Sequence, residues 1–150
     1  MNIDLSSLNI VTTANHLRKK DFSCKELVSA YLDNCKKQNG ELNAYLELFE
    51  DSANSSASDA QVIVNSGGGS LLTGVPLAIK DNILVEGKIA SCSSKILSNY
   101  RAVYDSTVTK KLKDNNVVIL GRTNMDEFAM GSSTENSAFG VTKNPHDTTR

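Results

Sequence analysis

The sequence lacks a long apolar stretch and a surplus of charge of one sign. No segment approaches the roughly 18 to 20 apolar residues that a membrane-spanning helix needs. Lys and Arg total 16 against 17 Asp and Glu, and the formal net charge is -1. Modules that bind nucleic acid or membrane surfaces through bulk charge present a strongly basic face, so this near balance argues against them. Residues 1–5 also show neither the basic nor the apolar part of a signal peptide.

Cysteine and histidine are also scarce. The chain has 3 cysteines, with no C-x-x-C pair, and 2 histidines, so a structural zinc site has almost no support. Cys24 and Cys35 would lie about three turns apart on one helix, which is too far for a disulfide. We therefore expect reduced thiols and a cytoplasm-like compartment.

The chain contains enough large apolar residues to form a core. Leu, Ile, Val and Phe make up about a quarter of it, above the roughly 20 % level of disordered chains. Residues 1–65 predict a layer of helices. Ser23 and Glu26 form a capping box that opens one helix, which we expect Gly40 to end. Two further helices complete the predicted layer. One covers 9–20 and is capped by Asn9, and the other covers 53–64 and carries a stripe of small apolar residues.

Residues 66–72 form a Gly/Ser-rich connector, and 73–150 predict the start of an α/β core. Apolar runs at 75–79 and 117–120 predict two strands. Between them we expect a helix over 105–115, capped by Asp105, with Val108 and Leu112 facing inward. Such a βαβ unit gives parallel strands. Because both runs are continuously apolar, we expect both faces of each strand to be covered.

The last part of the chain predicts one more helix and a long loop. The helix would begin near Asn124, with Glu127 completing a capping arrangement and Phe128 and Met130 as apolar contacts. Residues 131–150 are rich in Ser, Thr, Asn and Gly, which is typical of an extended loop. Two strands do not make a stable covered sheet, so we expect the chain to be the front part of a larger domain.

Lys80 is the strongest candidate for chemistry. It directly follows the predicted strand 75–79, and ligands bind at the carboxyl ends of strands in open α/β sheets. An ammonium partly removed from water there would have a lowered pKa, and a neutral lysine can act as a general base. The alternative is an ordinary lysine paired with Asp81 at a strand edge.

Other polar residues give weaker signals. Ser132 and Ser133 do not fit the G-x-S-x-G nucleophile elbow, although backbone N–H groups beside Gly131 could line a carbonyl-binding pocket. Asp126 and Glu127 are interpreted as charges at a helix N-terminus. The glycine-rich segments 66–70 and 87–88 do not have the pattern of a phosphate-binding loop. The loop histidine His146 has no pattern of a catalytic partner.

Two blocks of sequence carry a specific resemblance. Residues 74–82 (GVPLAIKDN) and 119–137 (ILGRTNMDEFAMGSSTENS) strongly resemble the amidase-signature family, as do 91–97 and 143–145. Within that family they are similar to the glutamine-hydrolysing subunits of tRNA-dependent amidotransferases. The resemblance implies an α/β fold, the N-terminal portion of an amidase-signature fold, with a mixed sheet covered by helices on both faces.

The resemblance also implies a Ser–cis-Ser–Lys triad. Lys80 matches the family's lysine, the base that acts through a bridging cis-serine on a nucleophilic serine. Met130, Gly131 and Ser132 match the loop that lines the family's amide-substrate pocket, Met130 through its backbone. Both serines of the triad, and the residues that hold the glutamine, would lie after Arg150, so we expect the 150-residue chain alone to be inactive.

The activity implied for the intact enzyme is that of a carbon–nitrogen ligase with glutamine as amido donor. Ammonia released from glutamine would pass to partner B and C subunits, where ATP and Mg²⁺ serve to convert Glu-tRNA(Gln) to Gln-tRNA(Gln) in protein biosynthesis. No cofactor is implied for this chain itself, and the expected location is the cytoplasm or the lumen of a bacterium-derived organelle. Two alternatives stay open: a stand-alone amidase for another small amide, and a truncated, non-catalytic interaction module.

Overall fold

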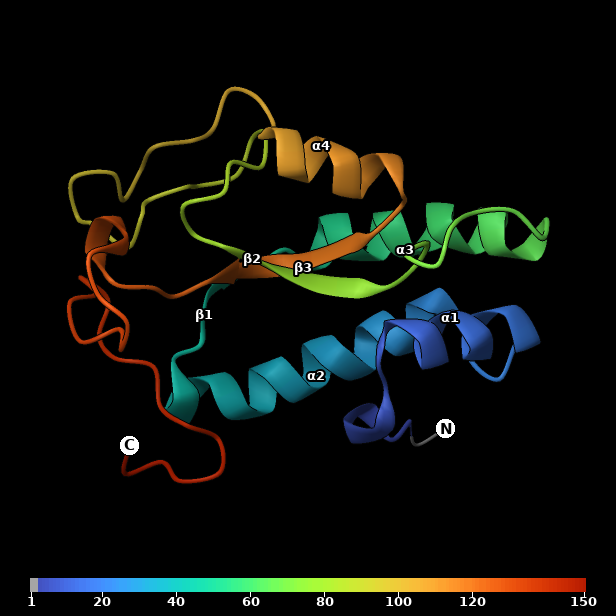
Figure 1. Cartoon of the computed structure of the whole chain (residues 1–150), viewed down its shortest axis with the longest axis horizontal. Coiled ribbons are helices and arrows are strands. Elements are labelled where there is room, and N and C mark those ends of the chain that lie inside the picture. The colour runs from blue at the N-terminus through green and yellow to red at the C-terminus, as the bar shows by residue number, and fades with distance from the viewer. Residues whose placement is uncertain (1–2) are drawn as a thin grey trace. The chain divides into compact units, whose positions relative to one another are not determined.

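The structure is a computed structural model that describes residues 3–150. Its elements follow one another along the chain as helices and short strands (Figure 1). They are η1 (Leu5–Ser7), α1 (Ile10–Lys19), α2 (Cys24–Leu42), β1 (Tyr45–Leu48), α3 (Glu50–Asn65), β2 (Pro76–Lys80), α4 (Thr107–Asp114), β3 (Val118–Thr123) and η2 (Glu127–Ala129).

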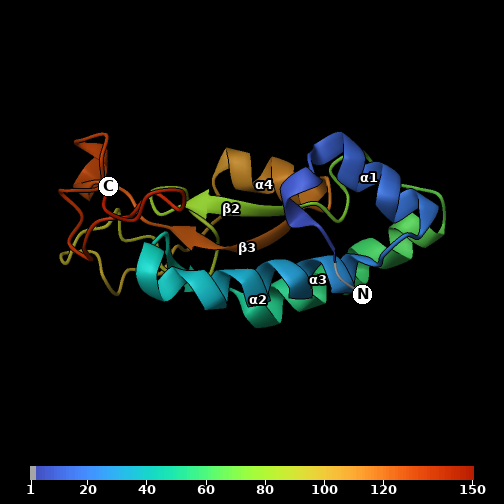
Figure 2. The same cartoon turned by 90° about the horizontal axis from the view of Figure 1, so that it is seen from below.

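The three strands form one mixed sheet in the order β1-β3-β2. β1 pairs antiparallel with β3, and a register shift between Tyr45 and Glu47 places Glu47 opposite Arg122. β2 runs in the same direction as β3, as Figure 2 shows, with hydrogen bonds from the Val118 amide to the Val75 carbonyl and from the Asp81 amide to the Thr123 carbonyl. The predicted parallel βαβ unit and the α/β class are therefore confirmed.

The chain divides into two compact units, each built from separated segments. The first unit comprises Met1–Asn34, Phe49–Leu77 and Lys111–Leu120, and the second comprises Cys35–Leu48, Ala78–Lys110 and Gly121–Arg150. Both units therefore combine residues from before and after the 66–72 connector.

The first unit has an apolar core. In α1 the side chains of Ala14 and Leu17 are buried, whereas Ile10 is exposed. The alanine stripe of α3 is buried as predicted, and such small side chains let a helix approach its neighbours closely. Other large buried groups of the unit come from α2 and from the first half of β3: Leu27, Val28, Leu32, Val118, Ile119 and Leu120.

The second unit buries far more polar groups than large apolar ones. Its buried apolar side chains are Ile79, Val85, Ala90, Ala102 and Met125. Its buried polar side chains are Asp81, Ser91, Ser93, Ser94, Thr109, Arg122, Asn124 and Asp126. A buried polar group costs free energy unless it is hydrogen-bonded, and among the described residues every buried side-chain nitrogen and oxygen has a partner. This hydrogen-bonded polar interior indicates that the candidate active site lies in the second unit.

Several helix ends are confirmed by their caps. The Asn9 side chain accepts hydrogen bonds from the Val11 and Thr12 amides. The predicted capping box also forms, because the Glu26 carboxylate accepts from the Ser23 amide and the Ser23 hydroxyl accepts from the Glu26 amide. Satisfying amides that would otherwise lack partners fixes where each helix begins.

Other boundaries differ from the predictions. Gly40 does not end α2, which continues to Leu42 and stops before Asn43, a residue with φ of 51°. The predicted helical layer over 1–65 contains the strand β1, whose partner lies more than seventy residues further along the chain. In α4, the Ser106 hydroxyl accepts from the Thr109 amide, and Thr109 rather than Val108 points inward.

The expected cover on both faces holds for only one of the two predicted strands. All residues of β3 from Val118 to Arg122 are buried. In β2, by contrast, Ala78 and Lys80 are exposed. β2 lies at the edge of the sheet, and residues two apart in a strand share a face, so the face of β2 that carries Ala78 and Lys80 is open.

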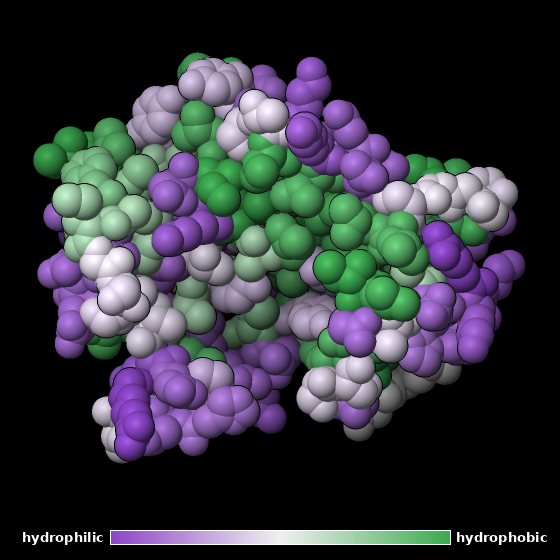
Figure 3. All heavy atoms as spheres, viewed as in Figure 1, coloured by the Kyte–Doolittle hydropathy of each residue, from purple (hydrophilic) through white to green (hydrophobic). Residues whose placement is uncertain are grey.

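Large apolar side chains also lie at the surface, and Figure 3 shows hydrophobic residues on the viewed face of the molecule. Those of the second unit that are at least half exposed are Ile96, Val103, Tyr104, Val108 and Met130. None of the helices in the described part of the chain has the length and apolar character to cross a membrane.

Candidate active site

Lys80 is the last residue of β2, so the structure places it at the carboxyl end of a strand, as predicted. Its side chain is exposed, which corrects the expectation that it would be partly removed from water. The next residue, Asp81, points in the opposite direction and is buried to 1 % exposure. The alternative of a simple pair between these two neighbours therefore does not describe the site, because the Asp81 carboxylate is engaged elsewhere.

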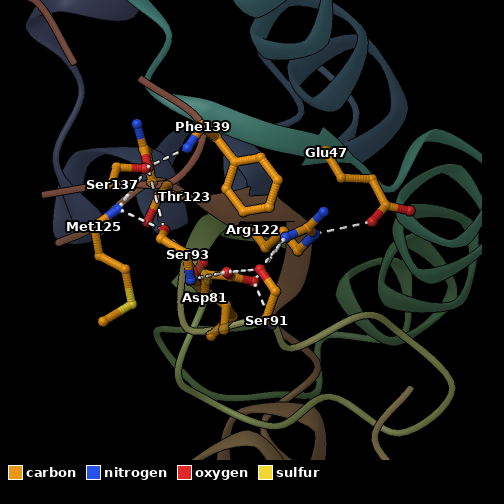
Figure 4. Close-up of polar contacts among 11 residues, drawn as sticks. Glu47, Asp81, Ser91, Ser93, Arg122, Thr123, Met125, Ser137 and Phe139 are labelled. Atoms are coloured by element: carbon orange, nitrogen blue, oxygen red, sulfur yellow. Dashed lines mark hydrogen bonds and ion pairs between the residues drawn. The ribbon is translucent and has the colours of Figure 1, made fainter. Parts of the chain in front are cut away.

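The Asp81 carboxylate is held by four donors inside the second unit (Figure 4). Its Oδ1 accepts from the Ser91 amide at 3.1 Å and from Arg122 Nη1 at 2.8 Å. Its Oδ2 accepts from the Ser91 hydroxyl at 2.5 Å and from the Ser93 amide at 2.7 Å. A carboxylate with all its acceptor positions occupied has one orientation, and this fixes the backbone from which Lys80 projects.

Arg122 joins two strands through its side chain. Its guanidinium contacts Asp81 on one side and Glu47 of β1 on the other, where Nε lies 3.0 Å from Oε2. The preceding residue is glycine because a Cβ at position 121 would collide with the carbonyl oxygen of Glu47. This close approach of two backbones lets the ion pairs form. The signal missed in the sequence was an arginine two residues after the apolar run 117–120, since a charge buried with such a strand is retained only with partners.

A second polar centre follows β3. The Asn124 side chain accepts from the hydroxyls of Ser93 and Ser137, at 3.2 and 2.6 Å, and donates to the Gly140 carbonyl at 2.8 Å. The amide of buried Met125 donates to the Ser93 hydroxyl at 3.2 Å. Ser93 thus connects this centre to the Asp81 carboxylate, and both centres form one continuous network (Figure 4).

Asp126 organises the loop that the family resemblance predicts to line a substrate pocket. Its carboxylate accepts from the amides of Ser133 at 3.0 Å, Thr134 at 2.9 Å and Asn136 at 3.0 Å. The hydrogen bonds from the Thr134 and Asn136 amides, together with that from Ser133 and the positive charge of Lys80, hold the pKa of Asp126 below its ordinary value. One carboxylate therefore holds three backbone positions of the loop that follows η2.

The predicted helix near Asn124 does not form. Only the three-residue turn η2 is present, because Phe128 adopts a left-handed conformation with φ of 51°. Phe128 and Met130 are exposed rather than apolar contacts of a helix. Asp126 is likewise not a helix N-terminal charge, since its carboxylate turns to the loop that follows.

The three predicted substrate residues Met130, Gly131 and Ser132 lie together in an exposed stretch of this loop. Ser133 uses its hydroxyl to donate to the Glu135 carboxylate at 2.9 Å. His146 is exposed, as predicted for a surface histidine. The loop as a whole is irregular from residue 131 to the end, in agreement with the composition.

Cys92 lies between the two serines that bind Asp81. Burial and the negative charge of Asp81 both raise the pKa of its thiol, so the group is protonated near neutrality and is a poor nucleophile. All three cysteines are free. In the described range 3–150, no group of three or more His, Cys, Asp and Glu side chains is arranged to hold a metal ion.

Comparison with known proteins places this geometry in a family. A sequence model described as Amidase matches residues 26–150. The chain belongs to the amidase family. It is also 47 % identical over 148 residues to the A subunit of the glutamyl-tRNA(Gln) amidotransferase of Ruminiclostridium cellulolyticum, covering 99 % of this chain and 30 % of that protein.

Solved amidase structures share the fold. The A subunit of the glutamyl-tRNA(Gln) amidotransferase of Thermotoga maritima is 33 % identical with a TM-score of 0.77, over 100 % of this chain and 30 % of that one. A structure described as a vestigial protein complex that reveals the origins of an s-triazine catabolic enzyme is 30 % identical with a TM-score of 0.88, over 95 % of this chain and 32 % of that one. The chain thus spans about a third of the length of the amidases that it matches, and it has a partial amidase-signature fold.

Proposed function

We propose that this chain supplies the lysine-bearing third of a glutamine-hydrolysing amidotransferase subunit. The observation that carries the proposal is the position of Lys80 at the carboxyl end of β2, directly before the immobilised Asp81. The names of the relatives that match nearly the whole chain support the amidotransferase assignment.

In the proposed reaction, Lys80 accepts a proton through a bridging cis-serine, and a second serine attacks the amide carbon of glutamine. Backbone N–H groups stabilise the resulting oxyanion. The proton held by Lys80 returns through the cis-serine to the leaving nitrogen, so that ammonia departs, and water then releases glutamate from the acyl-enzyme. We place both serines in the part of the relatives that this chain does not span. We infer that, in a subunit of the relatives' length, the same part covers the open face of Ala78 and Lys80 and so desolvates the lysine.

The assembly is proposed to contain B and C subunits, with ATP and Mg²⁺ acting at a partner protein rather than on this chain. Ammonia from glutamine would serve there to convert Glu-tRNA(Gln) to Gln-tRNA(Gln). A second candidate is a stand-alone amidase for another small amide. It is favoured by one observation, the TM-score of 0.86 to the peptide amidase of Stenotrophomonas maltophilia against 0.77 to the Thermotoga maritima protein.

A chimera tests the proposal. This chain is joined to the part of the Ruminiclostridium cellulolyticum relative that it does not match and is produced with that organism's B and C subunits. The chimera should release glutamate from glutamine, the chain alone should not, and Lys80→Ala should lower the rate by at least about 100-fold, the contribution typical of a general base. Hydrolysis of simple amides with no activity on glutamine would instead support the second candidate, and full activity of Lys80→Ala would contradict both.

A further inference from the structure

Asp126 holds the loop that contains the proposed substrate residues. We infer that Asp126 is a positioning residue, which fixes the loop of residues 130–136 so that an amide substrate is held in one place relative to the base. The inference rests on the proposed function and adds to it a residue that the substrate would not itself touch.

The first support is how Asp126 is anchored. It follows β3 by only three residues, and both Asn124 and Met125 before it are buried in the network around Ser93. Asp126 itself is only 4 % exposed. A side chain on so constrained a backbone can hold a loop in one place.

The second support is how completely the carboxylate is used by the loop. Oδ2 accepts from the amides of Ser133 and Thr134, and Oδ1 accepts from the amide of Asn136. Three separate positions of an otherwise irregular loop are therefore tied to one group. The same three bonds require two acceptor oxygens, which only a carboxylate offers, because an asparagine would present an amino group to one of the amides.

The third support is the contact with Gly131. A Cβ built at this position would lie 2.5 Å from Asp126 Cγ and 2.6 Å from Oδ1, closer than side chains approach one another. The backbone of the predicted substrate residue thus rests directly on the carboxylate. Any larger residue at 131 would push the loop away or displace the acid.

The fourth support is the charge of Lys80, which acts on the same carboxylate. The positive charge of Lys80 therefore favours the anionic form of the group that holds the proposed substrate loop. A displacement of about 1 Å between reacting groups can cost about 100-fold in rate, so a group that sets this separation has a direct effect on turnover.

Two measurements test the inference. In the 150-residue chain, Asp126→Asn should make the amides of Ser133, Thr134 and Asn136 exchange about threefold to tenfold faster with solvent, the range for a lost hydrogen bond. In the chimera, Asp126→Asn should lower kcat/KM for glutamine by about 10- to 100-fold, with a rise in KM. Gly131→Ala keeps the carboxylate but displaces the loop, and should give the same kinetic change.

The matched control is Asp4→Asn, which alters another carboxylate that caps a backbone amide, that of Ser6, in the first unit. It should change neither the exchange of the loop amides nor the kinetics. The inference is overturned if Asp126→Asn leaves the loop amides protected, or leaves KM and kcat unchanged while Lys80→Ala abolishes activity. A chimera that is inactive, or is active without Lys80, contradicts the proposed function instead, and the exchange experiment still decides whether Asp126 holds the loop.

Discussion

Replacing Asp81 with asparagine should strongly destabilise the second unit. The carboxylate is fully buried and pairs with Arg122, whose side chain is only 10 % exposed. Asparagine must turn its amino group either to Arg122 and the Ser91 amide or to the Ser93 amide, so at least one donor loses its acceptor. Breaking one partner of a buried pair costs about 3–5 kcal/mol, a large part of the roughly 5–15 kcal/mol that stabilises a typical domain.

We expect a value near the lower figure, about 3 kcal/mol, because Glu47 still pairs with Arg122 and is partly exposed. For a chain of this length that corresponds to a fall in Tm of about 6–12 °C. Urea unfolding of the 150-residue chain, followed by circular dichroism, gives the free energy if the slope with urea is unchanged.

Two further variants make the experiment specific to the buried pair. Asp81→Asn combined with Arg122→Met removes both charges, and should cost less than the sum of the two single variants. Arg150→Gln disrupts the exposed pair with Asp147 and should cost no more than about 1 kcal/mol. A loss below about 1 kcal/mol for Asp81→Asn would refute the view that this network organises the unit.

Three further outcomes follow from individual groups. Gly121→Ala should lower the free energy of unfolding by about 1–3 kcal/mol in the urea assay, because its methyl group meets the Glu47 carbonyl; unchanged stability would show that the strands can separate there. Cys92 should react with iodoacetamide more slowly than a free thiol near pH 7, since its pKa is raised; fast labelling would contradict this environment. The lowered pKa values of Asp126 and Glu26 mean that both carboxylates stabilise the fold above their ordinary values of 3.8 and 4.5, and that this contribution is lost as the pH falls through the lowered values. Urea midpoints should therefore fall between about pH 5 and about pH 3, and by a smaller amount in Asp126→Asn; an equal fall in that variant would contradict the assignment.

The elements with strong local signals were predictable from the sequence. The caps at Asn9 and Ser23 involve residues three apart, so the pattern is visible without knowledge of the rest of the chain. The continuous apolar run of β3 likewise predicted that both faces of this strand are buried. The position of Lys80 at a strand end followed from the run that precedes it.

The elements that depend on distant partners were not predictable in this way. β1 has only four half-buried residues, and it is a strand because β3 pairs with it. Pairing of this kind depends on tertiary context more than on local preference. The turn at Phe128 replaced a helix because Asp126 bonds to amides up to ten residues ahead, which no local pattern reports.

The central claim of the proposed function is that Lys80 is the proton acceptor. The most direct measurement is the glutaminase rate of the active chimera carrying Lys80→Arg, which keeps a positive charge at the end of β2 but cannot give up its proton near neutrality. The account predicts a fall in kcat of at least about 100-fold with glutamine. A rate equal to that of the unsubstituted chimera would show that charge alone is needed at this position, and that Lys80 is not the proton acceptor.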